Sequence, residues 1–209
     1  MRLLACLVAA LVLPLHADDL VGSMIRGSSA PRKEFASPDG RWAVVVVLAG
    51  KAPHRGYLYS LRDRHTGATY LSEAAPLPDE ALARDIGAIW SPGSRYVALT
   101  IYYGPVVEGV AVIHCRDVPR YAAFSEAGET ALLKPQDRAR FGGVVRLRHF
   151  ALAWTGPAEL AVGSTMQAFL KGEDGAQKTL TADAVDTIRF HAETGVVVHR
   201  ERTAYDIGN

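Results

Sequence analysis

The sequence predicts an all-β fold in which three antiparallel four-stranded sheets form an incomplete, propeller-like stack. Runs of β-branched and apolar residues have strand length, turn-forming residues separate them, and one turn pattern recurs three times along the chain. An ordinary β-sandwich made from the same strands is the alternative. Helix signals are few, and the best candidate, at residues 79–86, has two turns at most.

The first 17 residues have the order of a secretory signal peptide. Arg2 precedes an apolar run at residues 3–13, and Pro14 and Ala17 then supply a helix breaker and a small residue at a cleavage site. The apolar run is shorter than the about 20 residues that a membrane-spanning helix needs. We therefore expect residues 18–209 to form a single domain without a membrane span, in the bacterial periplasm or secreted.

The composition predicts a folded and nearly neutral protein. Of the 209 residues, 49% are hydrophobic and 22% are charged, which excludes a disordered chain. The 23 lysines and arginines face 22 acidic residues, and the loss of Arg2 with the leader makes the two counts equal. A neutral body has no global field that attracts nucleic acid or an anionic membrane, so neither is expected as a partner.

Cys115 is the one cysteine expected in the mature chain, because Cys6 leaves with the leader. An internal disulfide is then impossible. On a strand Cys115 shares a face with Ala111 and Ile113, whereas His114 points to the opposite face. We therefore expect a buried thiol, and we do not expect His114 and Cys115 to bind one metal or to act as a nucleophile and its base.

The predicted strands differ in how they are covered. Residues 43–48, 97–103 and 110–113 are apolar at almost every position, which indicates strands that are buried on both faces. Residues 57–62 instead place two tyrosines and a leucine on one face, which indicates a strand nearer the surface.

The recurring pattern is a hydrophobic residue or tryptophan, then a turn, then an apolar strand. Its copies span residues 35–44, 89–98 and 153–162. Proline presets φ for the first turn position, a Ser or Asp side chain bonds back to the turn backbone, and glycine accepts positive φ where the chain reverses. Each copy therefore predicts a hairpin whose leading side chain packs on the strand that follows.

A second hairpin closes each unit. These hairpins lie at residues 63–67, 116–120 and 191–195. The chain then divides into three blade-like units of about four strands each, at about 35–72, 86–124 and 144–202. Residues 167–184, with Gly172, Asp174 and Gly175, are expected to be an insertion inside the third unit.

The Ser-Pro-Asp-Gly-Arg hairpin at 37–41 and the Asp-to-Thr-Gly hairpin at 63–67 resemble the repeat of TolB-type β-propellers. The resemblance covers most of the mature chain, but the copy at 91–95 has Gly93 and Ser94 where the first has Asp and Gly, and the third keeps its aromatic residue and its turn. The resemblance implies blade-like sheets that act as a rigid binding platform. Propellers close with four to eight blades, so three units predict an open stack with an unpaired sheet edge.

No signature of a nucleophile elbow, a phosphate loop or a dinucleotide fold occurs in the sequence. No catalytic residue, cofactor or metal ligand is therefore predicted. His191 and His199 flank one hairpin and could face each other across it as metal ligands, but exposed hairpin histidines are the simpler interpretation.

Four residues form the predicted contact surface. Tyr102 and Tyr103 lie where a strand ends in a Gly-Pro loop, so at least one ring is expected to be exposed. Arg146 and Arg148 share one strand face, where two guanidinium groups side by side would hold a carboxylate or a phosphate. Solvated arginines are the alternative.

These observations favour a non-catalytic, exported module that binds another protein, or a second copy of itself, through an open sheet edge. One alternative is a secreted metal-dependent hydrolase or lactonase, because some propellers hold a metal at the ring centre. The other is an inhibitor or immunity-type protein, which the small size and the export both allow. The partner and any ligand are not specified by the sequence.

Overall fold

A computed structural model describes six stretches of the chain. They are residues 32–49, 56–70, 85–102, 107–122, 129–172 and 175–208. The predicted leader at 1–17, Tyr103 and most of the candidate helix at 79–86 lie outside these stretches. The end of that candidate helix is wrong, because Asp85 and Ile86 begin a strand.

The fold is all-β, and its strands fall into three antiparallel groups of four, as predicted. The first group comprises β1 (Arg32–Ala36), β2 (Trp42–Ala49), β3 (Gly56–Asp63) and β4 (Thr69–Tyr70). The second comprises β5 (Asp85–Trp90), β6 (Tyr96–Tyr102), β7 (Val107–His114) and β8 (Arg120–Tyr121). The third comprises β9 (Phe141–Gly156), β10 (Glu159–Lys171), β11 (Gln177–Phe190) and β12 (Val197–Gly208).

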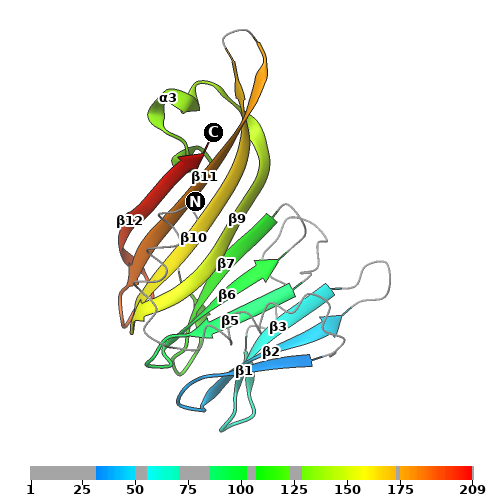
Figure 1. Ribbon diagram of the computed structural model, residues 1–209. Coiled ribbons are helices and arrows are strands. Elements are labelled where there is room, and N and C mark those ends of the chain that lie inside the picture. Colours follow the sequence, from blue (N-terminus) through cyan, green and yellow to red (C-terminus); the bar gives the residue numbers. More distant parts are fainter. Residues whose placement is uncertain are drawn as a thin grey trace.

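The three groups, called units one to three below, follow one another along the molecule (Figure 1). Unit one is a separate sheet in the order β1-β2-β3-β4. Units two and three join into one eight-stranded sheet, because β7 and β9 pair in parallel through Val107 with Leu147 and Glu108 with Arg148. No sequence pattern predicted this join. The described strands form two open sheets that do not close into a ring.

The two best copies of the turn pattern have the same hydrogen bonds. The Ser37 and Ser91 hydroxyls accept the backbone N–H groups of Trp42 and Tyr96 at 2.9 and 3.0 Å. The last turn position has positive φ in both copies, 71° at Gly40 and 55° at Ser94. Glycine reaches this region without cost, whereas Ser94 reaches it with some strain.

The closing hairpins of units one and three are also equivalent, although their leading residues differ. Asp63 Oδ1 accepts the N–H groups of the second and third residues after it, at 2.8 and 3.1 Å. His191 Nδ1 accepts the two corresponding N–H groups, both at 3.3 Å. Gly67 and Gly195 then adopt φ of 76° and 70°. An unprotonated imidazole nitrogen therefore takes the place of a carboxylate oxygen in this turn.

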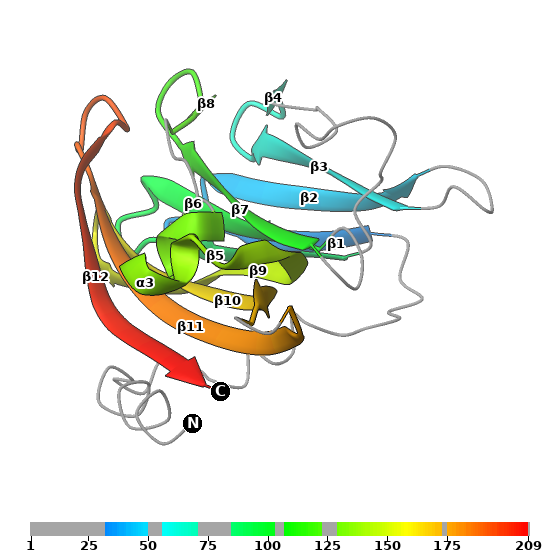
Figure 2. The same ribbon diagram turned by 90° about the horizontal axis from the view of Figure 1, so that it is seen from above.

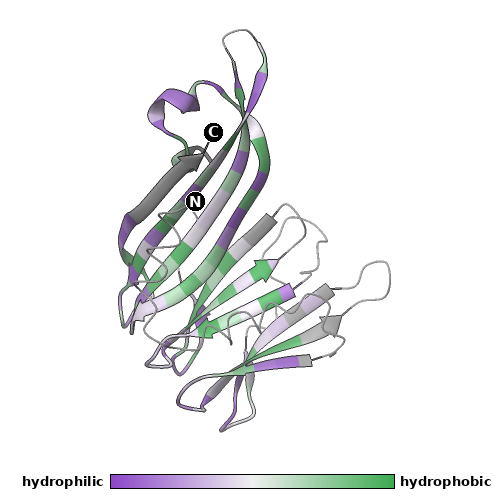
Figure 3. Cartoon of the chain, in the orientation of Figure 1, coloured by the Kyte–Doolittle hydropathy of each residue, from purple (hydrophilic) through white to green (hydrophobic). Residues whose placement is uncertain are grey.

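Unit two is buried on both faces. One face packs on unit one through a cluster that includes Trp42, Tyr59, Leu99 and Ile113. The opposite face packs on unit three through Tyr96, Ala98, Val110, Val112, Leu160, Val162, Ile188 and Phe190. This double burial explains the continuous apolar sequences of β6 and β7, and Figure 3 shows hydrophobic colours along β6 and alternating colours along β9.

The same hydrogen bond joins each unit to the one before it. The Trp90 indole N–H donates to the Phe35 carbonyl of unit one at 3.0 Å. The Trp154 indole N–H donates to the Ile89 carbonyl of unit two, also at 3.0 Å. Trp90 and Trp154 occupy equivalent positions of the repeat, as do Phe35 and Ile89. The repeat in the sequence is therefore also a repeat in how the units stack.

Unit three has the longest strands, and the predicted insertion at 167–184 is wrong. Residues 167–171 continue β10 and residues 177–184 continue β11, and the two strands stay paired from Glu159 with Arg189 to Lys171 with Gln177. The resulting sheet curves around a short connection that contains a 3-10 turn (Glu129–Leu132) and α3 (Pro135–Arg138) (Figure 2). Leu132 and Leu133 of this connection are buried against the sheet.

Candidate contact surface

Unit three has one face on unit two, and within the described residues no further unit covers its other face. Strand alternation and register place seven side chains there, and we call this set the open face. It comprises Arg146, Arg148, Thr165, Gln167, Phe169, Thr181 and Asp183. Arg148, Thr165 and Asp183 lie opposite one another in one row, and Arg146, Gln167 and Thr181 form the next row.

Arg148 also contacts unit two. Its guanidinium carbon lies 5.8 Å from the centroid of the Tyr102 ring, in the range of a cation–π interaction. Both residues are half-buried, so this pair contributes to the junction between units two and three as well as to the surface. Arg146 is half-buried in the next row, and within the described residues its Nε has no hydrogen-bond partner. The structure thus brings Tyr102 and Arg148 together and leaves Arg146 on the adjoining row.

Strand β12 borders the same unit. It pairs with β11 from Val197 to Gly208, and its other edge pairs with no strand of the described part of the chain. Val198 on this strand is 55% exposed. The edge also carries several charged residues, which is how natural sheets limit indiscriminate pairing. Strand β12 is therefore a long, charged edge at the open end of the stack.

An ion cluster holds β12 to the sheet. Arg200 and Arg202 both bind the buried Asp186 carboxylate, at 2.5 and 2.9 Å, and Arg202 also donates to the Ala131 carbonyl at 2.8 Å. Burial raises the pKa of Asp186, but the hydrogen bonds from Arg202 and Arg200 outweigh it and hold the pKa below its usual value. The edge strand is thus fixed by charge-assisted bonds rather than by apolar packing alone.

A buried His–Ser pair, which no motif in the sequence indicates, lies beside this cluster. His149 Nδ1 and the Ser164 hydroxyl are 2.8 Å apart, and each residue is only 2% exposed. Burial, with the nearby Arg200 charge, lowers the pKa of His149 to about 4, against the opposing effect of Asp186. A serine next to a neutral histidine is the start of a nucleophile–base pair. This pair is closed to solvent, so we assign it to the core.

His114 and Cys115 point to opposite sides of β7, as predicted. His114 stacks on the Tyr96 ring, with centroids 4.6 Å apart, and faces unit three. Cys115 belongs to the cluster between units one and two. Burial raises the pKa of the Cys115 thiol far above its usual value, which makes the thiol unreactive.

His191 and His199 are both exposed on the hairpin, as favoured, and the alternative in which they face each other as metal ligands is wrong. His199 lies opposite Arg189, and the His191 N–H bonds to the Val196 carbonyl in the turn. Among the described residues, no group of three or more His, Cys, Asp or Glu side chains is placed to hold a metal ion.

No helix in the described stretches has both the length and the apolar character to cross a membrane. Comparison of the chain with protein-family models, with curated proteins and with solved structures gave no match in any of the three.

Proposed function

We propose that this chain is an exported, non-catalytic module that binds another protein on the open face and the β12 edge of unit three. The observation that carries the proposal is the repeated stacking bond. Trp90 joins unit two to unit one and Trp154 joins unit three to unit two, and within the described residues no third bond of this kind continues the series.

The chemistry of the open face suits a protein partner. Phe169 is 36% exposed, and it lies among threonines, a glutamine, an aspartate and two arginines. A mixed surface with an aromatic residue and arginines is typical of non-obligate protein interfaces. The β12 edge beside it offers unpaired backbone groups to an extended segment of the partner, which is binding by strand addition.

The resemblance to TolB-type propellers and the predicted leader support the same proposal. A rigid stack of sheets is a binding platform, and export would place it in the periplasm or outside the cell. Self-association is one form of the proposal, in which two copies cover each other's open faces.

A photoreactive side chain at Gln167 tests the proposal in cells. Gln167 is exposed on the open face, and Glu193, exposed on the closing hairpin of unit three, is the matched control position. We expect one defined protein, or a second copy of this chain, to cross-link from position 167 and not from position 193. The cross-linked protein is then purified, and its affinity is measured for the wild type and for Thr181→Arg, which adds a bulky charge to the open face.

The expected result is a loss of affinity of at least about tenfold for Thr181→Arg and no loss for Glu193→Arg. Equal cross-linking from both positions, or equal affinity of both variants, would show that the open face is not the interface. Size-exclusion chromatography with light scattering decides between a foreign partner and a second copy.

A further inference from the structure

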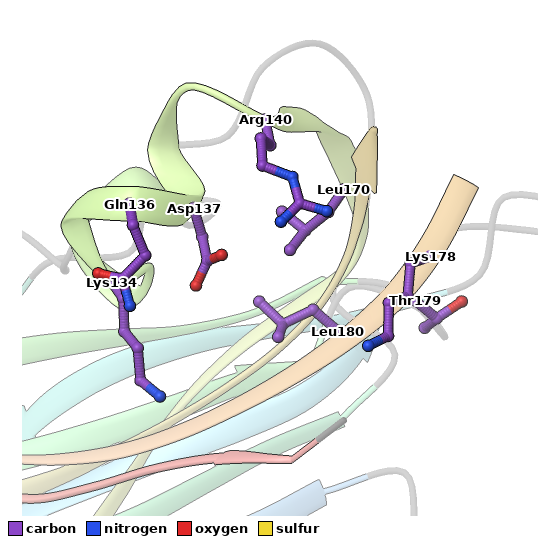
Figure 4. Close-up of a pocket in the computed structure, with 8 residues that line it drawn as sticks. All are labelled: Lys134, Gln136, Asp137, Arg140, Leu170, Lys178, Thr179 and Leu180. Atoms are coloured by element: carbon purple, nitrogen blue, oxygen red, sulfur yellow. The ribbon is translucent and has the colours of Figure 1, made fainter. Parts of the chain in front are cut away.

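A small cavity of about 120 Å³ lies between the 129–140 connection and the far ends of β10 and β11 (Figure 4). Its walls are Lys134, Gln136, Asp137, Arg140, Leu170, Lys178, Thr179 and Leu180. The lining of this cavity shares no residue with the open face.

The local sequence explains why the connection reaches over the strands. Leu132 and Leu133 are buried in the apolar cluster of unit three and anchor the connection to the sheet. Pro135 follows, and because proline fits the first turn of a helix, α3 begins there rather than earlier. Lys134, just before it, is extended, with φ of −61° and ψ of 148°. The connection therefore arrives at the cavity with Lys134 on its rim.

Positive charge exceeds negative charge in this cavity. Lys134, Arg140 and Lys178 contribute three cations, and Asp137 contributes one carboxylate. None of these four side chains forms an ion pair within the described stretches, whereas Asp186 pairs with Arg200 and Glu159 pairs with Arg189. Unpaired cations that line one cavity favour an anionic ligand.

Arg140 is held in position for such a ligand. Its Nε donates to the Lys171 carbonyl at 3.0 Å, and its two terminal nitrogens, which have no partner among the described residues, could bind two oxygens of one anion. Figure 4 shows this guanidinium near Leu170, with the Asp137 carboxylate on the helix side of the same space. Leu170 and Leu180 are buried, so they form an apolar wall beside the charges.

We propose that this cavity binds a phosphate monoester group. A phosphate monoester carries about −1.5 to −2 charges at pH 7, which matches the formal excess of two positive charges, whereas a carboxylate carries one. The volume corresponds to about four water molecules. It therefore accommodates the phosphate itself, and the rest of the ligand extends beyond the cavity. This inference does not depend on the proposed protein-binding function.

Glycerol phosphate, inorganic phosphate and acetate, titrated into the purified protein at low ionic strength by calorimetry or NMR, test the proposal. We expect saturable binding of the two phosphates, weaker binding of acetate, and a loss of affinity as salt is added. Vesicles of phosphatidylcholine with and without phosphatidic acid form a second arm. Binding of soluble glycerol phosphate identifies a free ligand, and binding of phosphatidic acid vesicles alone identifies a lipid headgroup as its source.

Lys178→Gln and Arg140→Gln are the test variants, and Arg138→Gln is the matched control. Arg138 lies on α3, next to the lining residue Asp137, but does not line the cavity itself. We expect each test variant to weaken phosphate binding by about fivefold or more, and the control to change it by less than twofold. Thermal unfolding of all variants confirms that they fold. The proposal is overturned if neither phosphate source binds, or if Arg138→Gln weakens binding as much as Lys178→Gln, which would indicate a diffuse basic surface.

Discussion

The Trp154 indole N–H donates to the Ile89 carbonyl at 3.0 Å, and this bond repeats the one from Trp90 to Phe35 at the preceding junction. Two sheets of different length and curvature are thus joined to their predecessors by the same donor and the same acceptor position. The tryptophan ring of unit three also packs against Tyr96 of unit two, with centroids 5.6 Å apart. The Trp154 side chain therefore joins units two and three both by its hydrogen bond and by its ring contact.

Removing the donor at either junction should weaken the stack by a similar amount. Trp90→Phe and Trp154→Phe keep an aromatic ring but leave the carbonyl acceptor without its partner, so each should lower the free energy of unfolding by about 1–2 kcal/mol. Urea unfolding followed by far-UV circular dichroism measures the change. Ala153→Ser, next to Trp154 and exposed, is the control. A loss at one junction only would show that the two bonds are not equivalent.

The buried His149 predicts a loss of stability in mild acid. Its pKa is about 4 in the folded protein and near 6.5 in the unfolded chain, so the unfolded state binds the proton first. The stability is complete above about pH 7.5 and falls as the pH drops through 6.5 towards 4, by an amount on the order of 3 kcal/mol. Asp186 has a lowered pKa and loses its contribution only below its unfolded value of 3.8, so it does not act in this window.

The free energy of unfolding in urea, measured between about pH 7.5 and pH 4.5 for the wild type and for His149→Asn, tests the role of His149. The asparagine amide can keep the contact with Ser164. The pH dependence of the variant should be flatter than that of the wild type. Some dependence should remain, because burial and the nearby Arg116, Arg120 and Arg95 charges also lower the pKa of His114. His65→Gln, at an exposed turn, should leave the wild-type curve unchanged. Parallel curves for His149→Asn and the wild type would contradict the assignment.

Gly195 is required for a close contact and not only for its turn. Gly195 and Gly67 have the same φ sign and the same place in equivalent hairpins, but a Cβ at Gly195 would lie 3.1 Å from His114 Nδ1, whereas one at Gly67 meets nothing within 4 Å. Gly67→Ala should therefore cost about 1 kcal/mol for its backbone alone. Gly195→Ala should cost clearly more, since the turn must also move off His114. Equal costs in chemical unfolding would show that the contact adds nothing.

Gly163 makes room for the Phe150 ring on the neighbouring strand. A Cβ on Gly163 would lie 2.4 Å from the Phe150 ring, so Gly163→Ala should destabilise the protein by about 1–3 kcal/mol. Gly93→Ala, where nothing lies within 4 Å and φ is not positive, should have little effect. In the double variant with Phe150→Leu, the cost of Gly163→Ala should shrink, because the two residues are in contact. Additive costs in the double-mutant cycle would show that the ring is not the obstacle.

The strands and turns of units one and two were predictable because their signals are local. A Ser-Pro turn forms its own hydrogen bonds within six residues. A continuous apolar strand after such a turn indicates burial on both faces, and unit two is buried in this way. The turn with His191 shows the limit of this reasoning. His191 is equivalent to Asp63 because its Nδ1 accepts the backbone N–H groups of the turn. The residue type alone does not show that a histidine nitrogen takes this role.

The four strands of unit three were predicted, but the His149–Ser164 pair inside it was not, because it depends on the register of β9 and β10. The hairpin begins with Gly156 opposite Glu159, and an undisturbed ladder from there would place His149 opposite Met166. Two irregularities, between Glu159 and Leu160 and between Ala161 and Val162, shift the register, so His149 meets Ser164 instead. The β7–β9 join depends on contacts between distant parts of the chain in the same way. The predicted contact residues Tyr102 and Arg148 meet across that join, and Tyr103 stays a prediction.

The first unit has Ala36 where the next two have Trp90 and Trp154. The stack is therefore polar. Unit one lacks the indole donor, whereas in unit three the Ala153 carbonyl lies at the acceptor position equivalent to Phe35 and Ile89. Another copy arriving head-to-tail brings no indole to that carbonyl, so the bond that builds the stack cannot build a fibre from it. A two-fold symmetric homodimer, with like surfaces meeting like, does not need this bond and stays possible.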